Sequence, residues 1–175
     1  MKFIREHAST AGTFALSPHA PYTASAELYR LCGDAARAQH LLLTTHLAES
    51  SEEEDMFRRG IGPMHDYFRR AGRDMTDCKR VGPVQLLHER GALGPNCIAA
   101  HCNKLTPPEI SLLQQSGTHV VHCPNSHRFF ARGTPLLGLL WDKQINVCLG
   151  TDSMASNSPG AELSMFSEMQ TMTKV

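Results

Sequence analysis

Short apolar runs alternate with amphipathic segments along most of this chain, and that alternation limits the folds open to it. Five runs rich in β-strand formers lie at residues 13–17, 41–45, 97–100, 118–123 and 145–149. Helical patterns that begin with capping residues or prolines separate the runs. Nearly continuous apolar strands joined by helices are typical of a parallel sheet with right-handed connections and helices outside it. The sequence therefore predicts an α/β protein.

Polar residues that can bind metals or move protons follow each of the five predicted strands. In chain order they are His19, His46 with Glu49, His101, Ser126 with His127, and Asp152. A doubly wound sheet concentrates its chemistry at one switch point, whereas a (β/α)8 barrel gathers residues from the ends of many strands. This spread favours a barrel. A full barrel takes about 250 residues, so this chain supplies only five of its eight units.

Local signals also predict how the segments between the strands are built. Thr23 is expected to cap the helix that follows the first strand, and one face of that helix is expected to carry Leu28, Leu31, Ala35 and Ala38. Residues 60–80 have little periodicity and are expected to form an inserted loop over a site. The arginines between positions 58 and 73 are interpreted as exposed helix charges in preference to anion ligands.

Length and composition favour one incomplete domain. The 175 residues suffice for one core, and the last helical pattern, 161–172, has no C-terminal capping signal. We therefore expect a partial catalytic barrel domain over residues 1–175 that is truncated at both ends.

Charge and cysteine content limit the partners and the setting. Basic and acidic residues number 17 each, so no overall charge favours a nucleic acid polymer or a membrane surface. No apolar run approaches the roughly 18 residues needed to span a bilayer. The six cysteines form no C-x-x-C pair, and several lie in apolar runs. These features predict a reducing, cytoplasmic setting.

Five short motifs, taken in order, resemble the amidohydrolase superfamily. They are His19-Ala-Pro-Tyr-Thr-Ala-Ser25, His46-Leu-Ala-Glu49-Ser50, Ala100-His101-Cys102, His122-Cys-Pro-Asn-Ser126 and Leu149-Gly-Thr-Asp152-Ser153. They are most similar to the branch of cytosine, guanine and S-adenosylhomocysteine deaminases and chlorohydrolase-like enzymes. The resemblance covers about residues 13–170. It implies that the five units are strands four to eight of a metal-dependent (β/α)8, or TIM, barrel.

The resemblance also implies a role for each matched residue at the metal. His46 and Asp152 would bind one Zn²⁺ or Fe²⁺ ion. Asp152 would in addition take the proton of the attacking water, and Glu49 would carry a proton to the substrate nitrogen. His101 would donate to the negative charge that develops during the reaction. Together these roles describe hydrolysis by an activated water.

The resemblance further implies which residues touch the substrate. His19 and Ser126 would contact a small heterocyclic molecule. His127 lies where relatives often carry asparagine, and we interpret it as a pocket-wall or surface residue and not as a metal ligand.

One departure from the family pattern leaves two functions open. The family draws two further ligands from a His-x-His pair, and none of the 10 histidines forms one, so half of the expected metal site is missing. The first hypothesis is that the chain is part of a hydrolase, of deaminase or chlorohydrolase type, that acts on C–N bonds of cyclic amidines or amino-heterocycles. The full-length hydrolase is then expected to be a homo-oligomer. The alternative is a non-catalytic half-barrel that serves as a folding or interaction module. An upstream reading frame that encodes His-x-His would separate them.

Overall fold

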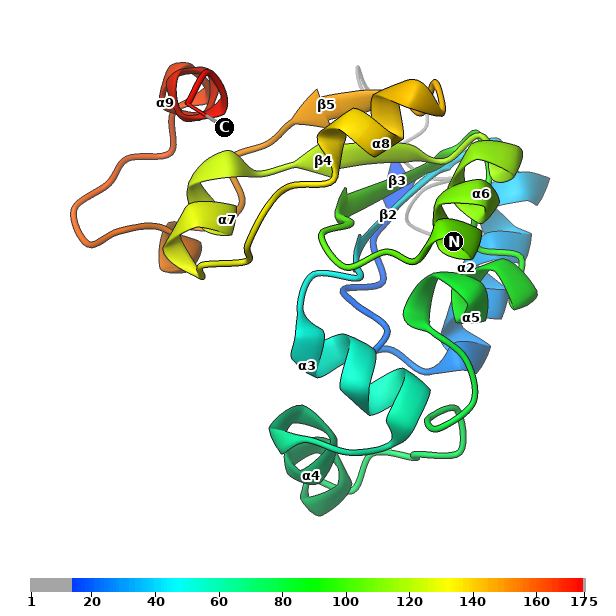
Figure 1. The fold of residues 1–175 in the computed structure, drawn as a ribbon. Helices are drawn as coiled ribbons and strands as arrows, with labels where there is room; N and C mark the ends of the chain where they lie inside the picture. The colour runs from blue at the N-terminus through cyan, green and yellow to red at the C-terminus, as the bar shows by residue number, and fades with distance from the viewer. Residues whose placement is uncertain (1–13, 175) are drawn as a thin grey trace.

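A five-stranded parallel sheet forms the centre of the computed structural model, which describes residues 14–174 (Figure 1). The strands are β1 (Ala15–Leu16), β2 (Leu42–Leu47), β3 (Cys97–His101), β4 (His119–His122) and β5 (Val147–Leu149). Each strand pairs in parallel with the next one along the chain. Sequential order is what a (β/α)8 barrel requires, whereas a doubly wound sheet reverses its order at a switch point. The prediction of a partial barrel is therefore confirmed.

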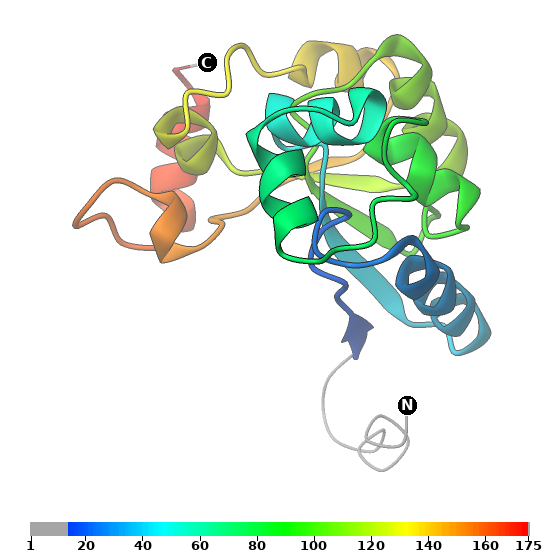
Figure 2. The same cartoon turned by 90° about the horizontal axis from the view of Figure 1, so that it is seen from below.

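Helices alternate with the strands, and some of them cover one side of the sheet. They are α2 (Ala26–Ala38), α3 (Ser51–Glu54) with its π-helical continuation η1 (Asp55–Arg59), α4 (Pro63–Arg70), α5 (Pro83–Glu89), α6 (Pro107–Ser116), α7 (Pro124–Phe129), α8 (Leu137–Asp142), the 3-10 turn η2 (Met154–Ser156) and α9 (Met165–Met172). Figure 1 shows α2, α5, α6 and α8 along one side of the sheet, and Figure 2 shows α7 and α9 beside each other. Over residues 14–174, no helix combines the length and apolarity needed to cross a membrane.

The two faces of the sheet differ in burial, as strand β2 illustrates. Leu43 and Leu47 are buried in the main core beneath the helices, whereas Thr44 and His46, on the other face, are partly exposed. Side chains alternate between faces along a strand, so each strand of this sheet presents one face to the helices. In a barrel the other face is directed toward the axis. His46 therefore lies on the inner face of the sheet, near the carboxyl end of its strand.

The predicted cap of helix α2 was wrong. Ser25 caps the helix by accepting a hydrogen bond from the Leu28 amide at 3.1 Å. Thr23 instead donates its hydroxyl proton to the Ala20 carbonyl, and the same oxygen lies 2.8 Å from His19 Nδ1. The threonine thus stabilises the loop that carries His19 instead of beginning the helix.

The predicted apolar face of α2 was also wrong. The buried residues of this helix are Tyr29, Gly33 and Ala36. Leu28 and Leu31 are 43% and 50% exposed. A glycine sets the face, because a Cβ atom built on Gly33 would lie 2.5 Å from the carbonyl oxygen of Gly91. Close contact between these two backbones rotates the leucines away from the core.

This close approach leads to a stability prediction with a matched control. Gly33→Ala is expected to destabilise the fold by about 1 to 3 kcal/mol, because the new methyl group must displace the backbone of Gly91. Gly138→Ala in α8 meets no atom within 4 Å and should stabilise the fold by about 0.5 to 1 kcal/mol through helix propensity. Urea titration of both variants tests the prediction, and equal effects of the two substitutions would contradict it.

Several segments differ from the sequence-based expectation in length or type. Residues 60–80 contain the regular helix α4, so they are not simply an inserted loop. Helix α7, which was not predicted, begins directly after β4 with Pro124 in its first turn. Strand β1 has only two residues, and residue 13 of the expected strand lies outside the described part of the chain. Helix α9 starts at Met165, later than the predicted start at residue 161.

Large apolar side chains are exposed near both edges of the sheet. Leu31 and Leu42 lie on the β1 side, and Trp141 and Phe166 lie on the β5 side, with Phe166 79% exposed. Unpaired edge strands flanked by apolar surface favour association between chains. We expect the purified chain to self-associate at micromolar concentration, as measured by sedimentation velocity. A monomer that melts in one cooperative transition would disprove this.

Candidate active site

Four predicted site residues meet where the strands end. His101 Nε2 lies 3.2 Å from His46 Nδ1, 3.9 Å from Glu49 Oε2 and 3.8 Å from Asp152 Oδ2. His46 and His101 come from β2 and β3, Glu49 follows β2, and Asp152 follows β5. Because the carboxyl ends of parallel strands share one edge of the sheet, residues up to 106 positions apart in the sequence become neighbours here.

The backbone is strained at the same strand ends. Ala48, His101, Cys102 and Asp152 have φ angles of 50°, 75°, 51° and 57°, in the left-handed region that residues with a Cβ rarely adopt. Such conformations persist only where surrounding contacts enforce them, and they cluster at functional sites. The strain therefore coincides with the group of predicted site residues.

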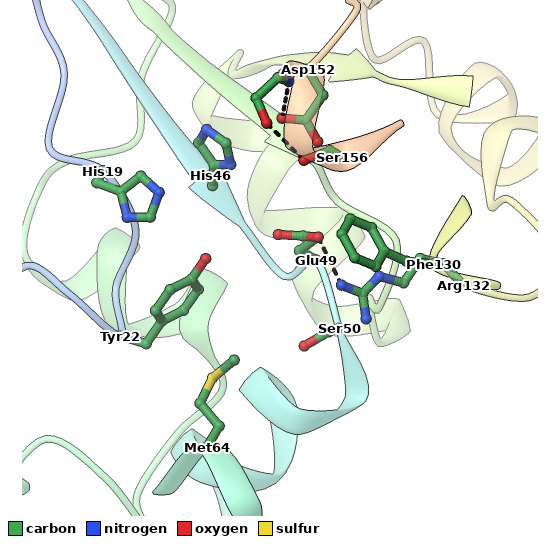
Figure 3. Close-up of a pocket in the computed structure, with 11 residues that line it drawn as sticks. His19, Tyr22, His46, Glu49, Ser50, Met64, Phe130, Arg132, Asp152 and Ser156 are labelled. Carbon is green, nitrogen blue, oxygen red and sulfur yellow. Dashed lines mark hydrogen bonds and ion pairs between the residues drawn. The ribbon is translucent and has the colours of Figure 1, made fainter. Parts of the chain in front are cut away.

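Glu49 is fixed through its backbone and its side chain. Its amide donates to Glu53 Oε2 at 2.8 Å, and its carbonyl accepts from Asn103 Nδ2 at 3.1 Å. Its Oε1 accepts from Arg132 Nη2 at 2.8 Å (Figure 3). The fully buried Glu53 also accepts from the amide of Ala48 at 3.1 Å, so a single carboxylate stabilises the strained turn that carries Glu49.

Two hydrogen bonds hold the carboxylate of Asp152 and favour its ionised form. Its Oδ2 accepts a hydrogen bond from Ser126 Oγ at 2.6 Å, and its Oδ1 accepts from the amide of Ser153 at 2.7 Å. Burial by itself would raise the pKa of Asp152, but the Ser126 hydrogen bond and the nearby His101 bring the pKa below its ordinary value. Ser126 thus contacts a predicted metal ligand, whereas the sequence predicted that it would contact substrate.

Burial biases two histidines of the site, His101 and His19, toward the neutral form. Burial lowers the pKa of His101, although the carboxylates of Glu49 and Asp152 act in the opposite direction. Burial, followed by the nearby His46, lowers the pKa of His19. The rings of His19 and His46 lie 5.0 Å apart between centroids. Neutral imidazoles can both coordinate a metal and donate a hydrogen bond.

A cavity of about 680 Å³ opens beside these residues. Its lining residues are His19, Tyr22, His46, Glu49, Ser50, Met64, Phe130, Arg132, Asp152, Ser153 and Ser156. Figure 3 shows His19, His46, Glu49 and Asp152 around it, with Tyr22 and Met64 on the side nearer α3 and α4. Aromatic and thioether side chains beside polar groups suit a small ring-containing molecule.

Seven lining residues were not among the predicted site residues, namely Tyr22, Ser50, Met64, Phe130, Arg132, Ser153 and Ser156. Tyr22 lies within the first matched motif, so its place beside His19 was an available signal. Arg132 follows the fourth strand by ten residues, and only the course of its loop brings it to Glu49. Burial, followed by Glu49, raises the pKa of Tyr22, so its phenol stays protonated.

His127 and the arginines between positions 58 and 73 lie outside this group. His127 is 7% exposed, and its ring nitrogens lie 3.0 Å from Asn103 Oδ1 and 2.8 Å from the Gly133 carbonyl. Arg59 is exposed and pairs with Asp55 in its own helix. Arg58 and Arg73 are instead partly buried and pair with Glu109 and Asp77, so the prediction of exposed helix charges was wrong for these two. His127 is thus a buried structural residue, and neither it nor Arg59 lines the cavity.

The donor atoms present fit a divalent metal ion. One ligand atom from each of His46, Glu49 and His101 lies within 4.8 Å of the others, and Asp152 is directly beside His101. Imidazole nitrogens and carboxylate oxygens are the ligands that zinc and iron take in hydrolases. The compact group includes Glu49 and His101, whereas the sequence predicted His46 and Asp152 as ligands.

Comparison with known proteins places this architecture in a family. The chain belongs to the Amidohydrolase family, which it matches over residues 1–175. It is 37% identical over 161 residues to a 5-methylthioadenosine/S-adenosylhomocysteine deaminase of Syntrophobacter fumaroxidans, covering 92% of this chain and 32% of that protein. It is 36% identical over 157 residues to a 5'-deoxyadenosine deaminase of Methanothermobacter thermautotrophicus, with 90% and 32% covered.

A solved structure shows the same relationship. The crystal structure of an adenosine deaminase from Xanthomonas campestris with bound zinc matches at a TM-score of 0.71 and 29% identity. The match covers 91% of this chain and 32% of that one. The chain thus spans about a third of the length of these relatives.

Proposed function

We propose that this chain forms the part of a metal-dependent deaminase that carries strands four to eight of the barrel, its proton-transfer residues and half of its metal ligands. The observation that carries the proposal is the meeting of His46, Glu49, His101 and Asp152 at one strained edge of the sheet. His46 and Asp152 would hold one Zn²⁺ or Fe²⁺ ion, with two further ligands from a His-x-His pair that this chain lacks. Such an ion would supply Lewis acidity and lower the pKa of the attacking water.

Proton transfer follows from the environments of the two carboxylates. Asp152 is ionised at neutral pH, because its pKa is lowered, and it can accept the proton of the attacking water. Glu49 directs Oε2 toward His101 while Oε1 is bound by Arg132. From Oε2 it would carry one proton of the water to the ring nitrogen, and the other proton, taken up by Asp152, would leave with the amine as ammonia. His101, neutral because it is buried, would donate to the oxygen where negative charge develops.

We propose a 6-aminopurine nucleoside, or a similar amino-heterocycle, as the substrate. Both sequence relatives described above are deaminases of adenosine derivatives. His19 and Tyr22 would contact the ring, and Phe130 offers a further apolar surface. Removal of chlorine from a triazine is a second possible reaction of the same chemistry, because water then displaces chloride instead of an amine from a ring carbon.

We also propose a cytoplasmic setting and, for the whole protein, a homo-oligomer. All six cysteines have free thiols, and five of them are wholly or partly buried, as expected in a reducing compartment. The apolar edges described above are consistent with burial against further barrel units or a second subunit.

Ammonia release tests the proposed activity. The coding sequence is extended upstream until it includes a His-x-His pair, and the product is assayed with zinc on adenosine derivatives, guanine, cytosine and triazines. We expect turnover of at least one amino-heterocycle by the extended protein and none by residues 1–175, since catalytic zinc generally needs at least three protein ligands. Turnover by residues 1–175 alone would contradict the proposed metal site.

One observation favours a second candidate function, a non-catalytic half-barrel. The chain contains no His-x-His pair, which leaves its own ligand set incomplete. If the upstream sequence lacks such a pair and the chain binds a protein partner through its exposed edges, this candidate replaces the deaminase.

A further inference from the structure

The segment between α7 and α8 carries Arg132 to the cavity and is held there by its backbone. The Arg132 amide donates to the carbonyl of His127 at 3.0 Å, and the Arg132 carbonyl accepts from Lys104 Nζ at 3.2 Å. The carbonyl of the next residue, Gly133, lies 2.8 Å from Nε2 of the buried His127. This segment is therefore tied both to α7 and to the end of β3.

The guanidinium group of Arg132 is also held in place. It lies over the ring of Phe130, with its central carbon 4.8 Å from the ring centroid, in a cation–π contact. Its Nη2 donates to Glu49 Oε1 at 2.8 Å, and its Nη1 lies 3.7 Å from Glu52 Oε2. The side chain is 19% exposed. A charge-assisted hydrogen bond in this partly buried place is stronger than one on the open surface.

These contacts give the two oxygens of Glu49 different surroundings. Oε1 is occupied by Arg132, whereas Oε2 lies 3.9 Å from His101 Nε2. Asn103 connects His127, which holds this loop, to the same glutamate. Its Nδ2 donates to the Glu49 carbonyl, and its Oδ1 lies 3.0 Å from His127 Nδ1. A carboxylate that is held by one oxygen can present only the other one to a substrate.

From this geometry we propose that Arg132 is a positioning residue that fixes Glu49 for proton transfer, and that His127 holds the loop of Arg132. This inference rests on the proposed function, because it assigns Arg132 to the same reaction. A role in binding an anionic substituent of the substrate is less favoured. Both Nη atoms of Arg132 are already directed at carboxylates, those of Glu49 and Glu52.

Steady-state kinetics of the extended protein separates these two roles. Arg132→Gln is expected to lower kcat by about 10- to 100-fold, because a displaced Glu49 transfers its proton poorly. The KM should change by less than about threefold, since ground-state binding is retained. Arg132→Lys keeps the charge and should recover part of the loss. Arg128→Gln, an exposed arginine of α7, is the matched control and should leave both constants unchanged.

A double-mutant cycle tests whether Arg132 acts through Glu49. If it does, adding Arg132→Gln to Glu49→Gln should cause little further loss of kcat. Independent losses that multiply would overturn the proposal, as would a normal kcat in Arg132→Gln. A raised KM with an unchanged kcat would assign Arg132 to substrate binding instead.

A measurement without turnover keeps the inference separate from the proposed function. In ¹⁵N NMR spectra of residues 1–175, the Arg132 Nη–H groups should give resolved, slowly exchanging signals. These signals should be lost in Glu49→Ala, which removes the acceptor, and kept in Glu54→Ala, which removes a carboxylate that pairs with Arg58 instead. Free rotation of the Arg132 guanidinium in the unmodified chain would refute the proposal that Arg132 fixes Glu49. An extended protein without turnover on any substrate would refute the deaminase proposal, while the NMR result would still decide the contact.

Discussion

Glu49→Gln in the extended protein is expected to lower kcat by about 10² to 10⁴-fold while the protein keeps its metal. An amide at this position can still accept from Arg132 through its oxygen, but it cannot carry a proton between water and substrate. Asp152→Asn should lower kcat at least as far and should also reduce the zinc content, because Asp152 is proposed both as ligand and as proton acceptor. Ammonia release and metal analysis of each purified variant provide the measurements.

A neighbouring carboxylate supplies the control for both variants. Glu54 lies on α3 outside the cavity and forms an ion pair with Arg58, so Glu54→Gln should retain full activity and full zinc content. Loss of zinc in Glu49→Gln would make Glu49 a ligand, as its grouping with His46 and His101 would allow. Full activity in either Glu49→Gln or Asp152→Asn would exclude the proposed division of roles.

The fold and the centre of the site were predictable because both depend on local patterns. Alternating apolar runs gave the parallel sheet, and the register of parallel strands brings His46 and His101 to the same edge. Their roles in catalysis remain proposals, but their position follows from where each strand ends. The same reasoning applies to Asp152, three residues after β5.

What could not be predicted depends on contacts between distant segments. Arg132 reaches Glu49 only because Lys104 and His127 hold its loop, and no spacing rule encodes those contacts. The face of α2 depends on Gly33 meeting Gly91, which outweighs the apolar character of Leu31. Helix α7 was not predicted, although proline suits the first turn of a helix and Pro124 stands there.

Glu53→Ala is expected to destabilise the fold by about 3 to 5 kcal/mol, since it leaves the amides of Ala48 and Glu49 unpaired and creates a cavity at a fully buried position. Glu53 is fully buried and accepts from the amides of Ala48 and Glu49, at 3.1 and 2.8 Å. Glu54→Ala, which removes only a partly exposed pair with Arg58, should cost about 0.5 kcal/mol. Urea unfolding measures both, and similar losses in the two variants would contradict the prediction.

The charge of Glu53 gives this prediction a pH dependence. Burial raises the pKa of Glu53 from 4.5 to about 7, although its two backbone hydrogen bonds act in the opposite direction. Between these values the folded chain keeps a proton that the unfolded chain has lost, so the free energy of unfolding should fall as pH rises from about 5 to 7.

In Glu53→Gln this contribution disappears, because the amide does not titrate. The unfolding free energy of the unmodified chain minus that of Glu53→Gln should therefore fall as the pH rises from about 5 to about 8. A difference that stays constant over this range would show that Glu53 is ionised throughout, and that its two hydrogen bonds outweigh its burial.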